Sequence, residues 1–76
     1  MVAIYEVSWI DSMATHGWTN EYSKPASITS VGYVIEDNEQ GIVLTESINH
    51  VPDSRKYGCV TAIPRSAIRK TRVIRK

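Results

Sequence analysis

Residues 30–48, SVGYVIEDNEQGIVLTESI, have the pattern of two β-strands joined by a tight turn, and this pattern limits the choice of fold more than any other stretch. Val31, Tyr33 and Ile35 alternate with the residues between them, a period of two that is typical of a half-buried strand. The acidic segment 37–41 supplies Asp, Asn and Gly for the turn, and the apolar run IVLT that follows predicts the second strand. Because a two-stranded hairpin alone is marginal in water, the remaining residues must complete the sheet and its core.

The rest of the chain predicts three more strands and two long connections. A first strand is expected at 2–10, where apolar and polar positions alternate, and the absence of periodicity over 11–27 predicts a long loop. The other expected segments are a polar connection at 49–58, a strand at 59–63, a single helical turn at 64–67 and a last strand at 69–74.

Five short strands without a substantial helix predict a single all-β domain, residues 1–76. We expect a strongly bent, five-stranded antiparallel sheet that closes into a small barrel with a long loop after its first strand, because closure removes exposed edges. Gly32 is expected where the second strand bends, since a side chain there would crowd the curved sheet. The side chains expected inside the barrel are Tyr5, Val7, Val31, Tyr33, Ile35, Ile42, Leu44, Val60, Ala62, Ile68 and Val73.

Composition is that of a globular chain rather than a disordered one, with 42% hydrophobic and 22% charged residues among 76. Cys59 is the one cysteine, which excludes an intramolecular disulfide, and we expect it to be buried and structural in a reducing cytosol. Glu6 interrupts the first apolar residues, no basic segment precedes them, and no apolar run reaches membrane-spanning length. We therefore expect a soluble cytoplasmic domain that does not bind a membrane.

The net charge of +1 conceals a strong segregation of charge along the chain. Residues 1–54 contain all eight acidic side chains and only Lys24 as a base, whereas residues 55–76 contain eight basic side chains and no acidic one. One interpretation is that charges balance between neighbouring strands. The other is a basic patch for a phosphate-bearing partner, or a self-complementary surface that favours homo-oligomers. The two interpretations are compatible.

The order of elements in residues 30–76 resembles that of the Sm-like and Src-homology-3-like small barrels. The resemblance rests on VGYV at 31–34, the acidic turn, IVL at 42–44, and IPRSAI at 63–68 before the final strand. It implies a small-barrel fold and, from the Sm-like proteins, the binding of single-stranded RNA.

Four short motifs are similar to those of a family of small bacteriophage proteins, most of which have no assigned function. They are WIDS at 9–12, HGW at 16–18, SVGY at 30–33 and AIPR at 62–65. The similarity implies a viral protein that works in the cytoplasm of its bacterial host. Phage proteins of this size often bind and block host components, and some are sponges that sequester nucleotide immune signals.

Functional side chains are densest in residues 9–18, which hold two indoles, an imidazole, a carboxylate and hydroxyl groups. Asp11, Ser12 and His16 are the residue types of a catalytic triad, but no nucleophile elbow or glycine-rich oxyanion segment accompanies them. Asp11 and Ser12 also suit the start of a turn, where their side chains bind nearby backbone amides. No spacing typical of metal ligands is present. We therefore expect no enzyme, no metal site and no cofactor.

Aromatic rings beside basic groups suit nucleotide recognition, because a ring stacks on a base, worth about 1–3 kcal/mol, while arginine forks bind phosphate oxygens. Trp9 either packs in the core or stacks on a ligand, and Trp18 either plugs the barrel or offers its face to a ligand. The C-terminal arginines alternatively form a solvated basic edge that opposes aggregation. The predicted ligand-binding residues are Trp9, Asp11, Ser12, His16, Trp18, Arg65 and Arg69.

The function expected from these observations is a non-enzymatic phage protein, assembled as a homo-oligomer, that captures a small nucleotide or cyclic-nucleotide immune signal. Two alternatives remain open: an Sm-like binder of single-stranded RNA, and a protein-interaction module that inhibits a host enzyme. Duplex DNA is not an expected partner, because the net charge is small and no recognition helix is present.

Overall fold

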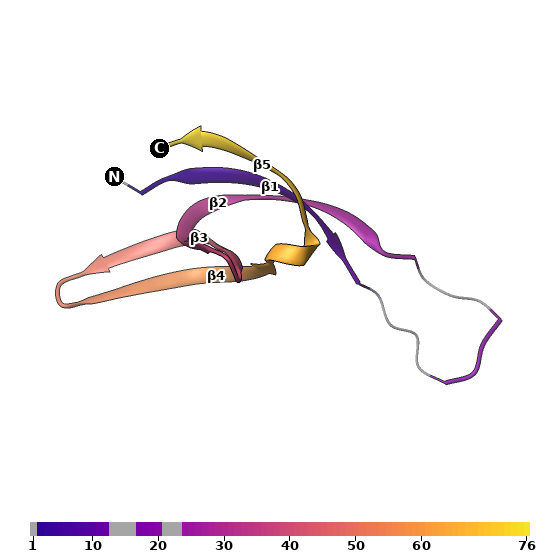
Figure 1. Ribbon diagram of the computed structural model, residues 1–76. Helices are drawn as coiled ribbons and strands as arrows, with labels where there is room; N and C mark the ends of the chain where they lie inside the picture. The colour runs from indigo at the N-terminus through magenta and orange to yellow at the C-terminus, as the bar shows by residue number, and fades with distance from the viewer. Residues whose placement is uncertain (1, 13–16, 21–23) are drawn as a thin grey trace.

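The computed structural model describes residues 2–12, 17–20 and 24–76, and within these ranges the strands form one antiparallel sheet (Figure 1). The elements are β1 (Ile4–Asp11), β2 (Ala26–Asn38), β3 (Gly41–Val51), β4 (Ser54–Pro64), the short 3₁₀ helix η1 (Arg65–Ala67) and β5 (Ile68–Arg75). The strands lie in the order β4-β3-β2-β1-β5 across the sheet. The prediction of an all-β chain with five antiparallel strands is confirmed. In these ranges no helix is long and apolar enough to cross a membrane.

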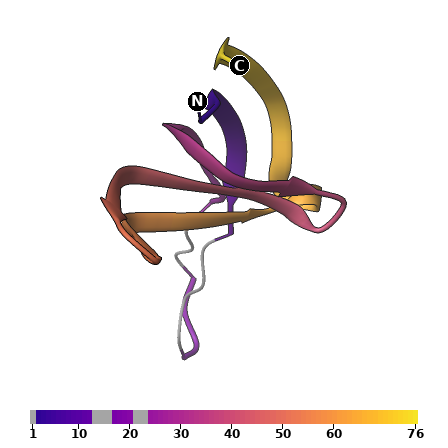
Figure 2. The same cartoon turned by 90° about the vertical axis from the view of Figure 1, so that its left-hand side faces the viewer.

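The sheet is curved but open, so the predicted closure into a barrel is wrong. β4 and β5 are the two outer strands, and they do not pair with each other in the described part of the chain. Closure would require β5 to continue beside β4, but η1 redirects the chain and β5 pairs along β1 instead. In Figure 2, β1 and β5 rise away from the ribbon of β3 and β4. Both outer strands therefore keep a row of backbone groups that no other described strand covers.

The core is small and is formed by side chains of β1, β3 and β4, with η1 packed against them. The buried apolar side chains are Val7, Ile42, Leu44 and Ile63, and Tyr5, Trp9, Val34, Ala67 and Ile68 pack against them. The predicted core positions Val7, Ile42 and Leu44 are confirmed. Ile63 was not among the predicted core residues, but it lies opposite Ile42 in the β3–β4 register and so shares its face.

Four predicted core positions are exposed instead. Val31, Val60 and Val73 keep 54%, 52% and 46% of their surface accessible, and Ala62 is also exposed. Val31 lies opposite Glu6, and Val60 and Ala62 alternate with Thr61 and Ile63, so these three side chains point away from the face that carries the core. Val73 lies opposite Tyr5 on the outer strand β5, which has a neighbouring strand on one side only in the described ranges.

β2 differs from the prediction in which of its faces packs on the core, and its pairing with β3 contains an irregularity. The register shifts between Val34 and Glu36, so one residue of β2 lacks a direct partner on β3. Tyr33, Val34 and Ile35 are all half-buried, and Val34, which lies opposite Leu44, is the one of the three that packs against the buried core. The period-two pattern therefore assigned Val34 to the wrong face.

Residues 49–58, expected to be a polar connection, instead extend β3 and β4 into a long hairpin. Ile48 lies opposite Tyr57 and His50 opposite Arg55, and the chain reverses at Pro52 and Asp53. Asp53 has a positive φ of 66°, which Asp tolerates better than most residues. We call residues 46–58 the arm, because in Figure 1 this part of the hairpin projects beyond the rest of the sheet.

Gly32 occupies a position where β2 approaches β3 closely. A Cβ atom at residue 32 would lie 2.8 Å from the Thr45 carbonyl oxygen and 3.1 Å from the Leu44 Cβ. The expectation that a side chain at this position would crowd the curved sheet is therefore confirmed.

Candidate ligand-binding surface

The two tryptophans have opposite environments. The Trp9 indole is half-buried against the core, and its Nε1 donates a hydrogen bond to the Ser30 Oγ at 3.0 Å. This favours the packing interpretation of Trp9 over stacking on a ligand. Trp18 has a relative exposure of 105% and lies in the segment that extends beyond the ends of β1 and β2 (Figure 1). Trp18 therefore does not plug the sheet, and its whole indole is accessible.

Two of the polar residues predicted to read a ligand, Asp11 and Ser12, lie at the end of β1. Asp11 ends β1, opposite Ala26 in β2, and both Asp11 and Ser12 are exposed. His16 lies outside the described residues. None of the contacts made by Asp11 or Ser12 in the described chain connects them with Arg65 or Arg69.

Arg65 and Arg69, predicted to hold phosphate, donate hydrogen bonds to the protein itself. Arg65 Nη2 lies 2.7 Å from the Asp37 carboxylate and also donates to the carbonyl oxygens of Asn38 and Gly41. Arg69 Nη1 donates to the Ser66 carbonyl oxygen at 2.9 Å. Arg65 thus joins η1 to the β2–β3 turn, and much of its donor capacity is used there.

The Asp37 carboxylate links this turn to the core. Burial raises the pKa of Tyr5, and so does the hydrogen bond that its hydroxyl donates to Asp37. Arg65 and Tyr5 therefore approach the same carboxylate from different elements. This network is structural, because it holds β1, β2 and η1 together.

A hollow of about 470 Å³ lies between the arm and the ends of β1 and β5. We call it the strand-end hollow, and its lining residues are Val2, Tyr33, Glu46, Ser47, Ile48, His50 and Arg75. It combines apolar walls with a cation, a carboxylate, an imidazole and an aromatic ring. These groups come from segments far apart in sequence. They meet in space because β2, β1 and β5 are neighbours in the sheet.

Arg75 is held at the edge of this hollow by two contacts. Its guanidinium lies over the Tyr33 ring, 6.0 Å from the ring centroid, and its Nη2 donates to the Val2 carbonyl oxygen at 2.8 Å. A cation at this distance from a ring face is attracted by the ring's quadrupole. The guanidinium has five N–H donors, so several remain for a ligand after the bond to Val2.

Glu46 faces the strand-end hollow on one side and Cys59 on the other. The Cys59 thiol donates a hydrogen bond to the Glu46 carboxylate, and this bond raises the pKa of the thiol. Cys59 is exposed and has a positive φ of 55°, so the expectation of a buried cysteine is wrong. It lies on β4, an outer strand that pairs only with β3 among the described strands.

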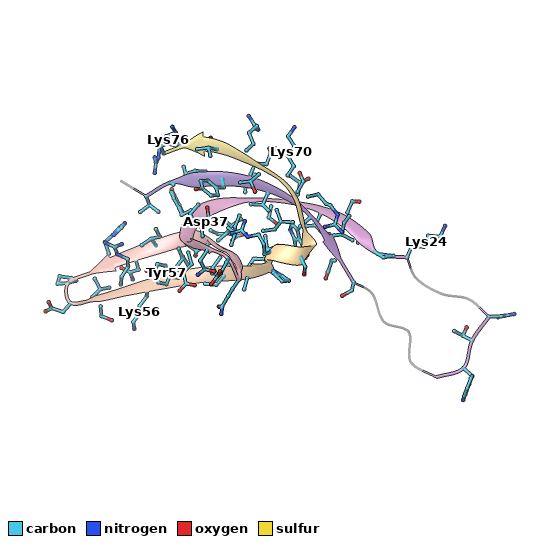
Figure 3. All side chains as sticks on the ribbon, in the orientation of Figure 1. Lys24, Asp37, Lys56, Tyr57, Lys70 and Lys76 are labelled. Atoms are coloured by element: carbon cyan, nitrogen blue, oxygen red, sulfur yellow. The ribbon has the colours of Figure 1, made fainter. Side chains whose placement is uncertain are left out.

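Charge balance between strands accounts for only part of the basic C-terminal segment. Glu6 lies opposite Arg72 in the β1–β5 register, and Arg72 Nη2 lies 3.1 Å from its carboxylate; this hydrogen bond lowers the pKa of Glu6. Arg65 and Arg72 are the two basic side chains of residues 55–76 that form ion pairs within the described ranges. Figure 3 shows Lys70 on β5 and Lys76 just beyond the end of that strand.

The residues of the strand-end hollow were not predicted as a site. Tyr33 was assigned to the core, and Glu46, His50 and Arg75 carry no motif that relates them. Only the strand order brings Arg75 to Tyr33, so spacing in the sequence gives no signal for the pair. Among the residues that the structure describes, no three His, Cys, Asp or Glu side chains are grouped as a metal site would require.

Comparison of the chain with family models, with curated proteins and with solved structures found no match. Any functional assignment therefore depends on the chemistry of the surface described above.

Proposed function

We propose that this chain is a non-enzymatic bacteriophage protein that binds a small nucleotide signal of its host and sequesters it. The observation that carries the proposal is the unpaired positive charge of residues 55–76. Six of its eight basic side chains have no carboxylate within ion-pair distance in the described part of the chain. Charges of one sign that are not neutralised internally attract an anionic ligand and speed its association.

Two aromatic rings lie on the same molecule as this positive charge, one exposed and one half-buried. Trp18 exposes its whole indole, and the Tyr33 ring lies under the Arg75 guanidinium. Rings stack on bases, and arginine binds phosphate through paired hydrogen bonds. A nucleotide offers both a base and a phosphate, which a simple anion does not. This combination favours a nucleotide over an acidic peptide or an inorganic ion.

Assembly into a homo-oligomer is part of the proposal. The outer edges of β4 and β5 present backbone groups with no strand partner among residues 2–12, 17–20 and 24–76, and natural sheets normally cover or block such edges. A second copy is the simplest cover. Light scattering on the purified full chain should give a mass that is a multiple of 8.5 kDa. A mass of one chain at micromolar concentration would remove the oligomer from the proposal.

The test of the binding function is isothermal titration calorimetry of the full chain with cyclic dinucleotides, cyclic trinucleotides and linear oligoribonucleotides. We expect saturable, stoichiometric binding of a cyclic nucleotide. Trp18→Ala shows where the ligand binds: a loss of about 5- to 150-fold, the equivalent of about 1–3 kcal/mol, marks a stacking indole, and an unchanged affinity marks a site elsewhere on the sheet. Tyr57→Ala, which removes another exposed ring, is the matched control and should change affinity little.

Two other results would point away from this function. Affinity that grows with oligoribonucleotide length and falls steeply with salt would favour a single-stranded RNA binder. Absence of binding to every nucleotide, with inhibition of an enzyme in host lysate, would favour a protein-interaction module.

A further inference from the structure

We infer that the strand-end hollow is the nucleotide site, with Tyr33 and Arg75 binding the base and phosphate and Glu46 selecting bases that carry an amino group. The inference depends on the proposed function and adds the place and the ligand class. The nucleotide site then lies at the opposite end of β1 from the segment around Trp18, where the sequence predicted it.

The size of the hollow suits one nucleotide unit. Its volume of about 470 Å³ is within the range of about 300–1,000 Å³ that small-molecule pockets occupy. Tyr33 and Glu46 also line a second depression of about 280 Å³, together with Ile4, Val31 and Gly32. The ring and the carboxylate therefore stand between two adjoining spaces, and a ligand can contact them from either one.

Arg75 has the properties of a phosphate ligand. It makes no ion pair with a described carboxylate, and its hydrogen bond to Val2 and its contact with Tyr33 fix its position before a ligand arrives. A side chain that is already ordered loses less entropy on binding. His50 faces the same hollow from the arm and supplies a second nitrogen donor. Arg65 and Arg69, in contrast, already donate to the carboxylate and backbone around η1.

Glu46 determines which base is accepted. An ionised carboxylate can only accept hydrogen bonds, so it favours an N–H group and repels a carbonyl oxygen. Adenine, guanine and cytosine each carry an amino group that can donate to a carboxylate, whereas uracil carries no amino group and has two carbonyl oxygens beside its single imide N–H. The same negative charge disfavours phosphate ions that bring no base. The hollow should therefore reject inorganic phosphate and bind uracil nucleotides weakly.

The experiment is calorimetric titration of the full chain with cyclic di-AMP, cyclic di-GMP, cyclic di-UMP and inorganic phosphate. Wild-type protein should bind at least one amino-bearing ligand, and bind it about tenfold or more tightly than cyclic di-UMP. Arg75→Gln should weaken that binding about tenfold or more, and Arg75→Lys should restore only part of it, because lysine lacks the planar fork. Lys70→Gln, which changes the same charge on β5, should have less than about a twofold effect.

Glu46→Gln tests the selection directly. The amide presents a donor as well as an acceptor, so the preference against cyclic di-UMP should fall while the fold is retained. Arg75 and Glu46 are both exposed, and thermal melting of each variant checks that it folds.

The outcomes separate the two proposals. If an amino-bearing nucleotide binds and Arg75→Gln and Glu46→Gln leave its affinity and selectivity unchanged, the inference is overturned while the proposed function stands. If no nucleotide binds the wild-type protein, both are overturned.

Discussion

Arg65 shows how an arginine that suits phosphate binding can instead stabilise a turn. Its side chain follows β4 and reaches back to Asp37 and Gly41, so it crosses from η1 to the hairpin turn of β2 and β3. Nothing in the IPRSAI segment distinguishes this role from ligand binding, because the partners lie far away in sequence. The same limit applies to Arg75 and Tyr33, whose contact depends on the strand order.

Replacing Arg65 should lower stability. Arg65→Ala is expected to reduce the free energy of unfolding by about 1–2 kcal/mol, since charged hydrogen bonds are lost but the ion pair is partly screened by solvent. Urea denaturation measures the change, and Arg69→Ala, which loses only bonds within its own segment, is the control. Equal stability of Arg65→Ala and the wild-type protein would contradict the bracing role.

Cys59 should react slowly for an exposed thiol. Its hydrogen bond to Glu46 raises the thiol pKa, so less of the reactive thiolate is present at a given pH. Glu46→Gln should lower the pKa and speed alkylation by iodoacetamide at pH values below that pKa. The rate measured against pH for the two proteins checks this. Superimposable profiles would show that Glu46 does not control the thiol.

The Glu6–Arg72 pair should make stability depend on acid. Because the folded-state pKa of Glu6 is lowered, its contribution is present above the unfolded-state pKa and is lost as pH falls through the folded-state pKa. Glu6→Gln should therefore lose less stability than the wild-type protein over the acid range. Melting temperatures from neutral to strongly acidic pH measure it, with Glu39→Gln as the control. Parallel curves for Glu6→Gln and wild type would contradict the pairing.

At the scale of elements, periodicity predicted the strands well where one face is buried. The segment around Ile42 and Leu44 was placed correctly, as was the short helical turn before β5, which the structure has as η1. The arm was missed because most of its residues are polar and exposed, so no alternation identifies them as strand. Its pairing comes from continuing the β3–β4 register beyond the core, which only the folded chain reveals.

Gly32 is the sharpest test of the packing of β2 on β3. Gly32→Ala should destabilise the protein by about 1–3 kcal/mol, because its Cβ would lie 2.8 Å from the Thr45 carbonyl oxygen. Gly58→Ala is the matched control, since its Cβ would meet nothing closer than 3.5 Å. Denaturant midpoints compare the two. A tolerated alanine at residue 32 would show that the strands can move apart.

At the scale of the molecule, the open sheet explains why the sequence predicted the fold class but not its closure. Five strands and an η1 connector are encoded locally, whereas pairing of β5 with β1 rather than β4 depends on long-range contacts. The same difference separates the two candidate sites. The Trp18 segment could be predicted because its residues are contiguous, while the strand-end hollow exists only once β1, β2, β3 and β5 are assembled.

The most direct test of the account is an NMR titration of the full chain with cyclic di-AMP and cyclic di-GMP. The account predicts saturable shift changes from one of these ligands, concentrated at Tyr33, Glu46, His50 and Arg75. A spectrum that does not change with either ligand would contradict nucleotide binding, and changes confined to the surroundings of Trp18 would contradict the proposed site.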